Sequence, residues 1–269
     1  RMDKMPVIKG LEWTFDTVAA AYEKFRPGYP DELYKMLFEY VAVDHSSRVV
    51  EVGIGGGQAT LPILKTGCAL TAVEYGEKFS KLCEKKFEDY EKFSIVTGKF
   101  ENVRFPDLCY DLVYSASAFH WIPEEIGYPK VYAMLKHRGA FARFANHPCR
   151  DKGNPALSAE IDKLYAKYYY GYYGKAMKAE TEYNEEQAIQ RAQIAKKYGF
   201  VDIRHAMFYR TRTFGAEEYI ELLGTYSDHI AMEENIRKEF FTKIEEAIHQ
   251  YGGTLTIYDT IDLQLARKP

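Results

Sequence analysis

The chain has few cysteines, no long apolar run and no excess of positive charge, and each shortage excludes a class of protein. Its four cysteines are scattered over 269 residues without a CxxC pair, so we expect no disulfides. No apolar run approaches the ~20 residues that a membrane-spanning helix needs. The formal net charge of -3 gives no broad basic field, which argues against nucleic acid as a partner.

Metal and secretion signals are also missing. The stretch HPC (147–149) has no second pair of metal ligands, so we predict no metal site. The first ten residues, RMDKMPVIKG, contain no apolar stretch typical of a signal peptide, and we expect a cytoplasmic protein. With 46% hydrophobic residues, a chain of this length can bury roughly three quarters of its unfolded surface. We expect a monomer or homodimer that acts on a small molecule.

Strand and helix signals alternate through the first half of the chain. Short β-branched runs predict strands at 48–52, 69–75, 92–98, 110–117 and 140–145. Apolar residues at helical spacing predict helices at 58–67, 77–90 and near 129–137. This alternation requires a mostly parallel sheet with helices on both faces. The predicted fold class is α/β, with a Rossmann-like sheet of seven strands, an antiparallel edge strand and a helical lid or insertion.

The second half contains helices and two long β runs. The runs at 201–214 and 253–268 are expected to pair antiparallel at the sheet edge. We expect one domain over 1–269, with an N-terminal helical cap at 1–45, a cofactor-binding core at 46–146 and helical lid or insertion segments at 151–200 and 216–250. The tyrosine-rich run YAKYYYGYYGK, 165–175, is interrupted by two glycines, which favours a mobile lid; plain helix packing is the alternative.

The stretch VVEVGIGGGQAT, 49–60, carries the clearest functional signal. Its four glycines follow a strand, and glycine is used where a backbone takes positive φ or where a ligand approaches it closely. In an open parallel sheet, ligands bind at the carboxyl ends of the strands where the strand order reverses. A dinucleotide fingerprint would need glycine at position 58, which is glutamine, and a Walker A lysine is missing. A nicotinamide-dependent oxidoreductase is therefore disfavoured.

Two carboxylates narrow the choice of ligand. Glu74 ends the second predicted strand, 21 residues after Gly53, where an acid can accept hydrogen bonds from both hydroxyls of a ribose. Glu51 adds a negative charge just before the glycines, which would repel a pyrophosphate and favour an ammonium group. A ribose and an ammonium on one ligand indicate S-adenosylmethionine.

At this point the sequence resembles a known family. VVEVGIGGGQAT, the acid in AVEY and YDLVYSASAFHWI (110–122) are similar to the class I S-adenosylmethionine-dependent methyltransferases. The closer likeness is to the subgroup with the trans-aconitate and quinone-biosynthesis methyltransferases, whose members carry a similar FDTVAAAYEKFRPGYP opening (15–30) and FHW after the fourth strand. The likeness covers about residues 15–145.

The resemblance implies a set of cofactor-binding residues. Gly53 and Gly55 would line the methionine portion, Glu74 would bind the ribose and Tyr75 would pack on adenine. Further contacts would come from the Ser115 main chain at the amino group and from Tyr22 and Arg26 over the carboxylate. The family often has an acid where this chain has Lys99, so adenine recognition is expected to rest on backbone groups of Lys99 and Phe100.

The acceptor side is less defined. We expect Tyr29, His120, Trp121 and Arg143 to flank the acceptor beside Arg26, because cations and phenols around an aromatic wall suit a small organic acid. His120 is either a general base or a structural histidine. Carboxyl O-methylation is the favoured activity; a phenol, an amine, a quinone-like carbon or a macromolecule remains an alternative acceptor, and so does a non-catalytic S-adenosylmethionine-binding role.

Overall fold

The computed structural model describes residues 14–150 and 152–269, with side chains from residue 19 onward except that of residue 151. The first 13 residues of the expected N-terminal cap, and the Phe15 side chain of the opening motif, lie outside the described part. Within it, no helix is both long enough and apolar enough to cross a lipid bilayer.

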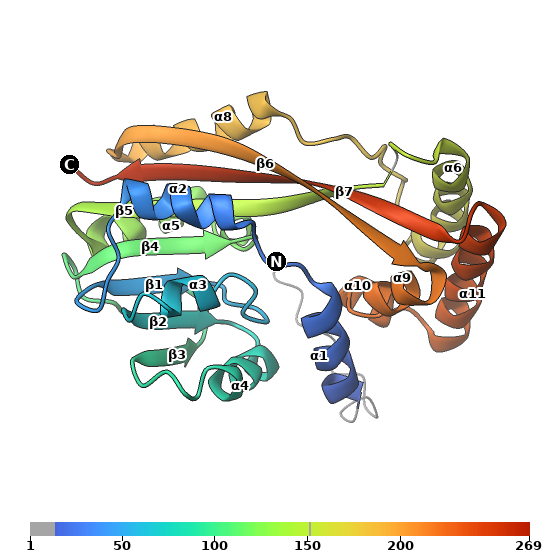
Figure 1. The fold of residues 1–269 in the computed structure, drawn as a ribbon, viewed down its shortest axis with the longest axis horizontal. Coiled ribbons are helices and arrows are strands. Elements are labelled where there is room, and N and C mark those ends of the chain that lie inside the picture. The colour runs from blue at the N-terminus through green and yellow to red at the C-terminus, as the bar shows by residue number, and fades with distance from the viewer. Residues whose placement is uncertain (1–13, 151) are drawn as a thin grey trace.

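A seven-stranded sheet of order β3-β2-β1-β4-β5-β7-β6 organises the molecule (Figure 1). Its strands are β1 (Arg48–Val52), β2 (Ala69–Glu74), β3 (Phe93–Thr97), β4 (Tyr110–Ala116), β5 (Leu135–Cys149), β6 (Val201–Gly215) and β7 (Thr254–Arg267). Strands β1 to β5 are parallel, and β7 runs antiparallel to both β5 and β6. The predicted fold class is confirmed, with one refinement: the antiparallel strand is second from the edge.

Helices cover both faces of the parallel strands. Those on one face are α2 (Asp31–Tyr40), α3 (Leu61–Leu64) and α4 (Glu77–Lys86), which share a core with β1, β4, β5 and β7. On the other face lie α5 (Glu124–Met134), α8 (Glu185–Gln193) and the 3-10 helix η3 (Ile194–Tyr198). Helix α3 is shorter than predicted at both ends, since residues 58–60 belong to the glycine turn and residues 65–67 form a turn.

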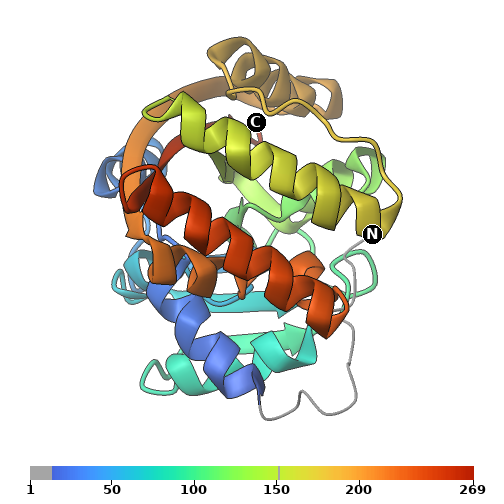
Figure 2. The same ribbon diagram turned by 90° about the vertical axis from the view of Figure 1, so that its right-hand side faces the viewer.

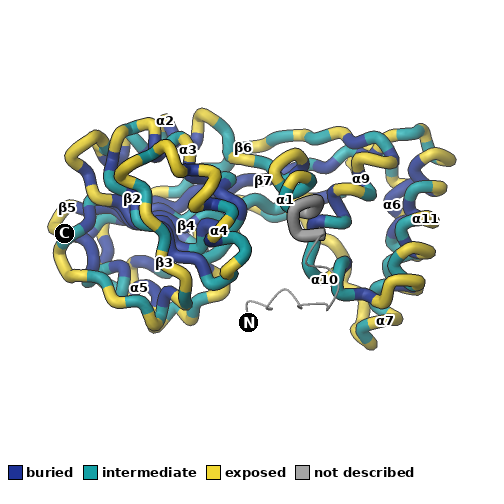
Figure 3. The backbone as a smooth tube through the Cα atoms, turned by 90° about the horizontal axis from the view of Figure 1, so that it is seen from below, coloured by how far each residue is buried: buried dark blue, intermediate teal, exposed yellow. Residues whose placement is uncertain are grey.

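Three strands extend beyond this hydrophobic core and contribute to a second hydrophobic core. Strands β5, β6 and β7 are 14 or 15 residues long, whereas β1 has five. Around their far end pack α1 (Thr14–Phe25), α6 (Pro155–Leu164), α7 (Gly171–Tyr173), α9 (Ala216–Leu223), α10 (Ser227–Ile230) and α11 (Glu234–Gln250), here called the helical lobe (Figures 1 and 2). Figure 3 shows this lobe and the sheet lobe joined by β6 and β7.

The tyrosine-rich run is packed into the helical lobe. It forms a π-helix, η2 (Tyr165–Tyr170), in which Tyr168 is buried and stacks on Phe240 of α11. The Tyr165 hydroxyl shares a 2.7 Å hydrogen bond with His229, and Tyr169 donates to Asp228. These contacts favour the packing alternative for the tyrosines. A lid motion stays a prediction, and such a motion would involve the helical lobe as a unit.

The expected 151–200 insertion divides between the two lobes. Residues 155–173 belong to the helical lobe, whereas α8 lies along β6 and β7 of the sheet lobe. A capping box at Asn184 and Gln187 starts α8, and the segment 174–184 crosses between the lobes.

Candidate functional site

The glycine turn lies at the carboxyl end of β1, where the strand order reverses between β1 and β4. Gly53 has φ +75°, and a Cβ there would lie 2.5 Å from the Ala118 Cβ. A Cβ on Gly56 would lie 2.5 Å from a ring carbon of Tyr22. Both positions therefore require glycine. At Gly53 both the positive φ and the contact with Ala118 exclude a side chain, and at Gly56 the contact with Tyr22 does. The close neighbours at both positions are side chains of this chain, Ala118 and Tyr22. That the turn also holds a ligand stays a prediction.

Glu74 is held at the end of β2 by backbone amides. Its side chain is buried, and its two oxygens accept hydrogen bonds from the Gly55 N–H at 2.9 Å and the Gly76 N–H at 2.6 Å. Burial raises the pKa of this carboxyl, and the two amides act in the opposite direction. Each oxygen keeps a lone pair for a further donor. The carboxylate is thus fixed next to the glycine turn, as a ribose ligand would have to be.

Glu51 lies beneath the turn with one oxygen unused. The hydroxyls of Thr60 and Tyr114 both donate to its Oε2, at 2.7 and 2.8 Å. Its Oε1 and the Nε2 of Gln58 are buried and have no hydrogen-bond partner among the described residues. Burial raises the pKa of Glu51 to about 7. An unpaired acceptor and an unpaired donor at one turn fit a ligand end that carries both an ammonium and a carboxylate, as S-adenosylmethionine does.

The last turn of α1 and the residue after it connect the glycine turn to the helical lobe. The Tyr22 ring covers Gly56, and the Arg26 guanidinium lies 4.9 Å from the ring centroids of both Tyr22 and Tyr226. Tyr226 precedes α10. Tyr22 therefore lies against the glycine turn and Arg26 lies beside Tyr22, while their contact with a cofactor carboxylate stays a prediction.

The expected adenine and amino-group contacts occupy the neighbouring strand ends. The Lys99 ammonium lies 5.3 Å from the centroid of the Tyr75 ring, which puts these two residues side by side. The Phe100 side chain is buried in the core and its carbonyl accepts from Lys130. Ser115 is fully buried and its hydroxyl donates to the Val52 carbonyl, so its side chain is committed within the sheet.

The turn after β4 contains a strained residue. Ser117 has φ +53°, a region that non-glycine residues adopt rarely and often at functional sites. Its Oγ shares a 2.8 Å hydrogen bond with the Tyr29 hydroxyl and accepts from the Asn146 N–H at 3.2 Å. Burial raises the pKa of Tyr29 to about 12, so this hydroxyl keeps its proton.

The predicted acceptor residues do not form one wall. Successive residues of a strand point to opposite faces, so Arg143 and Phe144 on β5 are separated by the sheet. Tyr29 packs edge-on against Phe144, whereas Arg143 donates to the Tyr128 hydroxyl on the α5 face at 3.1 Å. The structure therefore places Tyr29 with Arg26 on the α2 side and Arg143 on the α5 side.

His120 and Trp121 lie in η1 (Phe119–Trp121), the 3-10 helix after β4. Both side chains are exposed, and their ring centroids are 4.7 Å apart. Desolvation, together with Arg143, Arg191 and His147, lowers the pKa of His120 to about 4. The lowered pKa keeps the imidazole neutral near pH 7.

The structure contains two buried polar clusters that were not predicted from the sequence. Asp259 of β7 is buried between Arg210 and Arg212 of β6. The signal was present in FYRTRTF, where alternation puts both arginines on the face that otherwise carries Phe208 and Phe214.

The second cluster lies on the opposite face of β7. Asp262 is fully buried, with His147 Nε2 at 2.8 Å and the Tyr183 hydroxyl at 2.9 Å. The His147 and Tyr183 rings stack at 3.6 Å, which fixes the end of the crossing segment onto β5.

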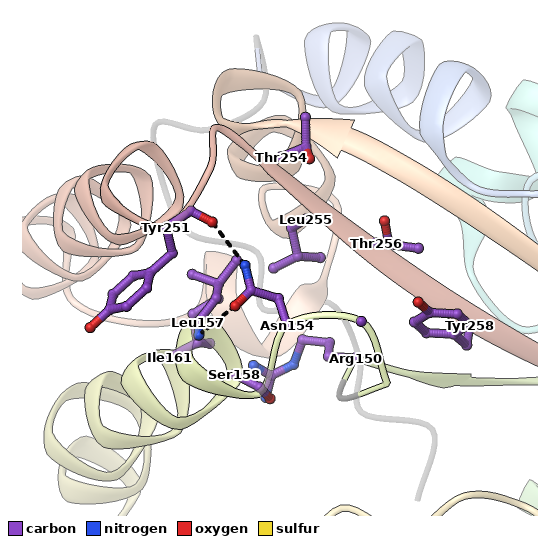
Figure 4. A pocket seen from close by; sticks show the side chains of 11 residues that line it. Arg150, Asn154, Leu157, Ser158, Ile161, Tyr251, Thr254, Leu255, Thr256 and Tyr258 are labelled. Carbon is purple, nitrogen blue, oxygen red and sulfur yellow. Dashed lines mark hydrogen bonds between the residues drawn. The ribbon is translucent and has the colours of Figure 1, made fainter.

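A separate cavity of about 300 Å³ lies in the helical lobe between α6 and the start of β7 (Figure 4). Arg150 lines it, with Asp162 at 3.1 Å and Glu180 at 3.7 Å, so the arginine charge is already compensated. Asn154 caps α6 there and also donates to the Tyr251 carbonyl. We assign no part of the methyltransferase site to this cavity.

The sheet order, with a glycine turn at its point of reversal, defines the architecture of a class I methyltransferase. Residues 50–142 match a family model described as a methyltransferase domain. An uncharacterized methyltransferase of Schizosaccharomyces pombe is 24% identical over 236 residues, which cover 87% of each chain. One of Geobacillus sp. is 29% identical over 146 residues, covering 51% of this chain and 68% of the relative. The chain is an S-adenosylmethionine-dependent methyltransferase.

Solved structures share the fold at low identity. Phosphoethanolamine N-methyltransferase 2 of Haemonchus contortus, in complex with S-adenosylhomocysteine and phosphomonomethylethanolamine, aligns with a TM-score of 0.56 and 17% identity. The alignment covers 96% of this chain and 59% of that longer one. The YcgJ protein of Bacillus subtilis aligns with a TM-score of 0.56 and 14% identity, over 89% of this chain and 99% of its own.

The position of Glu74 predicts a large effect on cofactor affinity. Glu74→Ala should remove one or two charge-assisted hydrogen bonds and weaken binding of S-adenosylhomocysteine by about 30-fold or more in isothermal titration calorimetry. Glu77→Ala, which removes an exposed carboxylate three residues further along, is the control and should bind normally. Unchanged affinity of a folded Glu74→Ala variant would contradict the ribose assignment.

The raised pKa of Glu51 predicts a pH-dependent stability difference. The carboxyl has a pKa of about 7 in the folded protein against 4.5 as its ordinary value, so its contribution to folding is present below pH 4.5 and lost as the pH rises through 7. Glu51→Gln removes this loss. Urea unfolding of the ligand-free variant should show a gain of about 3 kcal/mol near pH 8.5 and little gain near pH 4.5. Equal differences at both pH values would contradict the assignment.

Proposed function

We propose that the chain transfers the methyl group of S-adenosylmethionine to a carboxylate oxygen of a small organic acid. The observations that carry this proposal are the Tyr29 hydroxyl, hydrogen-bonded to the Ser117 Oγ at 2.8 Å, and the Arg26 charge on the same side of the sheet; the pKa of His120, lowered to about 4, agrees with it. A phenol, an amine or an enolisable carbon must lose a proton to react, and a base of this pKa is poorly matched to that task near neutral pH. A carboxylate is already anionic and needs no base.

The groups on the α2 side support an anionic acceptor. Tyr29 keeps its hydroxyl proton and can donate it, and Arg26 supplies a positive charge between two aromatic rings. We infer that these two residues face the acceptor and that Trp121 forms an outer wall. Arg143, committed to Tyr128, and His120 would then act from the α5 side on the electrostatic field rather than by direct contact.

We assign cofactor binding to the residues around the glycine turn. Glu51 would hold the amino group, Gly53 and Gly55 would line the methionine portion, and Glu74 would hold the ribose. The remaining assignments are Tyr75, Lys99 and Phe100 at adenine, the Ser115 main chain at the amino group, and Tyr22 and Arg26 at the carboxylate. Their support is that Tyr22 lies against the turn with Arg26 beside it, and that Tyr75 and Lys99 lie side by side.

The reaction moves no proton under this proposal. Bound S-adenosylmethionine supplies a methyl carbon that is activated by the adjacent positive sulfur. The acceptor oxygen bonds to that carbon as the carbon–sulfur bond breaks, and the electron pair of that bond stays on sulfur. The work of the protein is to align the oxygen and to exclude water. Tyr29, fixed by Ser117, is placed to orient the acceptor.

The resemblance to the trans-aconitate and quinone-biosynthesis subgroup also supports an organic acid as the acceptor, since one of the named members of that subgroup acts on an organic acid. Phenols, amines, quinone-like carbons and macromolecules remain the alternative acceptors.

A screen of acceptors tests the proposal. We expect methyl esters to form when the enzyme and S-adenosylmethionine are incubated with a panel of small organic acids, and mass spectrometry would detect them. Phenols, amines and quinones should give no comparable product. Methylation of these compounds in preference to every acid would overturn the proposal.

His120→Gln separates the two roles considered for this histidine. Because a carboxylate acceptor needs no base, the variant should keep substantial turnover between about pH 6 and 9, with the same pH profile as the wild type. A general base would instead cost ~100-fold or more in rate, with a changed profile. Steady-state rates on an acid from the screen would decide, and a large pH-dependent loss would contradict carboxylate methylation.

A further inference from the structure

The cavity of the helical lobe borders two buried polar groups that lack partners. It has a volume of about 300 Å³ and lies between α6 and the start of β7 (Figure 4). Arg150 and Ser158 both line it, and within the described part of the chain Arg150 Nη1 and Ser158 Oγ have no hydrogen-bond partner. Ser158 is only 6% exposed. Leaving buried donors and acceptors unpaired is costly, and at this cavity there is space for a molecule that pairs them.

The Arg150 guanidinium is fixed against the face of α6 that carries Ser158. Its Nη2 donates to Asp162 Oδ1 at 3.1 Å, and its Nε lies 3.7 Å from a carboxylate oxygen of Glu180. Asp162 follows Ser158 by four residues, so the two side chains are neighbours on one face of the helix. The guanidinium is thus held through Nε and Nη2, and the remaining nitrogen, Nη1, is left on the same side as the serine hydroxyl.

The cavity offers hydrogen bonds without an excess of positive charge. Arg150 is the positive group, and the carboxylates of Asp162 and Glu180 both lie close to it. An anionic ligand would therefore meet more negative than positive charge, and a cationic ligand would meet the guanidinium at the wall. An uncharged ligand avoids both repulsions and still accepts a hydrogen bond from the arginine.

The rest of the wall is a mixture of apolar and polar side chains. Leu157, Ile161 and Leu255 line the cavity and are buried. Asn154 also lines it, but its side chain is already used, because its oxygen accepts from the Leu157 N–H and its nitrogen donates to the Tyr251 carbonyl. A water molecule takes about 30 Å³ in the liquid and needs two to four polar partners, which the three apolar side chains do not supply. The wall therefore suits a small organic molecule with one polar end.

We propose that this cavity is a second ligand site, which takes a small uncharged amide. The amide carbonyl accepts a hydrogen bond from Arg150 Nη1, and the amide N–H donates to Ser158 Oγ, so that both unpaired atoms gain a partner. The hydrocarbon part of the ligand lies against Leu157, Ile161 and Leu255. The site shares no residue with the glycine turn, and the inference does not rest on the proposed methyl transfer.

A ligand in this cavity would join three elements of the helical lobe. Ser158 belongs to α6, Tyr251 is the residue that ends α11, and Leu255 belongs to β7. A molecule that binds the folded protein and not the unfolded chain raises the stability of the fold. We therefore expect occupancy of the site to raise the melting temperature of the protein.

Titration with benzamide, followed by heteronuclear NMR, tests the site. S-adenosylhomocysteine is kept at saturation, so that benzamide does not bind at the glycine turn. We expect saturable shifts of the Leu157, Ser158 and Leu255 amide signals with a Kd on the order of 1 mM, which is in keeping with a ligand of this size. Benzoate has the same shape but is anionic, and it should bind about 10-fold more weakly. Unshifted signals, or equal binding of benzamide and benzoate, would overturn the inference.

Ser158→Ala separates ligand binding from folding. The change removes a buried hydroxyl that has no partner, so the ligand-free variant should melt at the same temperature as wild type or higher, while its affinity for benzamide falls by about 10-fold. Lys163→Ala removes an exposed side chain from the same helix and is the control, which should bind benzamide as wild type does. A ligand-free Ser158→Ala variant that melts at a lower temperature and binds benzamide normally would show that the hydroxyl serves the fold, and the inference would be wrong.

Arg150→Lys tests the other half of the site. Lysine keeps a positive charge beside Asp162 and Glu180 but lacks the planar fork that leaves Nη1 on the cavity. Benzamide affinity should fall by about 10-fold in the NMR titration, and the rise in melting temperature with benzamide should shrink in proportion. Unchanged affinity in the folded variant would contradict the assignment of Arg150 as the donor to the amide.

Discussion

The antiparallel pairing of β6 with β7 is the interaction on which the rest of the structure depends. It continues from Val201 and Arg267 to Gly215 and Thr254, far beyond the parallel core. On one face of this ribbon, Ile261 and Leu263 pack in the sheet lobe, while Leu255 and Ile257 pack in the helical lobe. Since both hydrophobic cores share the same two strands, the position of the helical lobe over the glycine turn is set by backbone hydrogen bonds rather than by a flexible linker.

The polar cluster occupies the place where the two cores meet on that ribbon. Phe208 packs toward one core and Phe214 toward the other, with Arg210 and Arg212 between them. Apolar side chains at these positions would have joined the cores into one. A buried ion pair is weak evidence for stability, because desolvation offsets much of its attraction. The cluster therefore marks the boundary between the two cores, and Arg210 there donates to the Gly28 carbonyl of the segment between α1 and α2.

The sequence predicted the sheet and the glycine turn because both depend on local pattern. β-Branched runs and glycine spacing are visible within ten residues, and the strands matched to within a few positions. It did not predict that β5 continues to Cys149, since Pro148 and its polar neighbours lack a strand signal and only pairing with β7 extends it. It also grouped Tyr29 with Arg143, although strand alternation, visible in FARFA, places Arg143 and Phe144 on opposite faces.

Buried polar groups without a hydrogen-bond partner lower the folding stability, and they also favour ligands that can satisfy them. An unpaired buried donor or acceptor costs about 1–3 kcal/mol of folding stability, and the pairs Glu51 with Gln58 and Arg210 with Arg212 each carry that cost. A ligand that satisfies them recovers the cost on binding, whereas a ligand lacking the matching group leaves it in place. One pair lies at the glycine turn and the other on the long strand β6. Under the proposed function, a cofactor end that carries an ammonium and a carboxylate would recover this cost at Glu51 and Gln58, whereas the cost at the two arginines remains part of the folded protein.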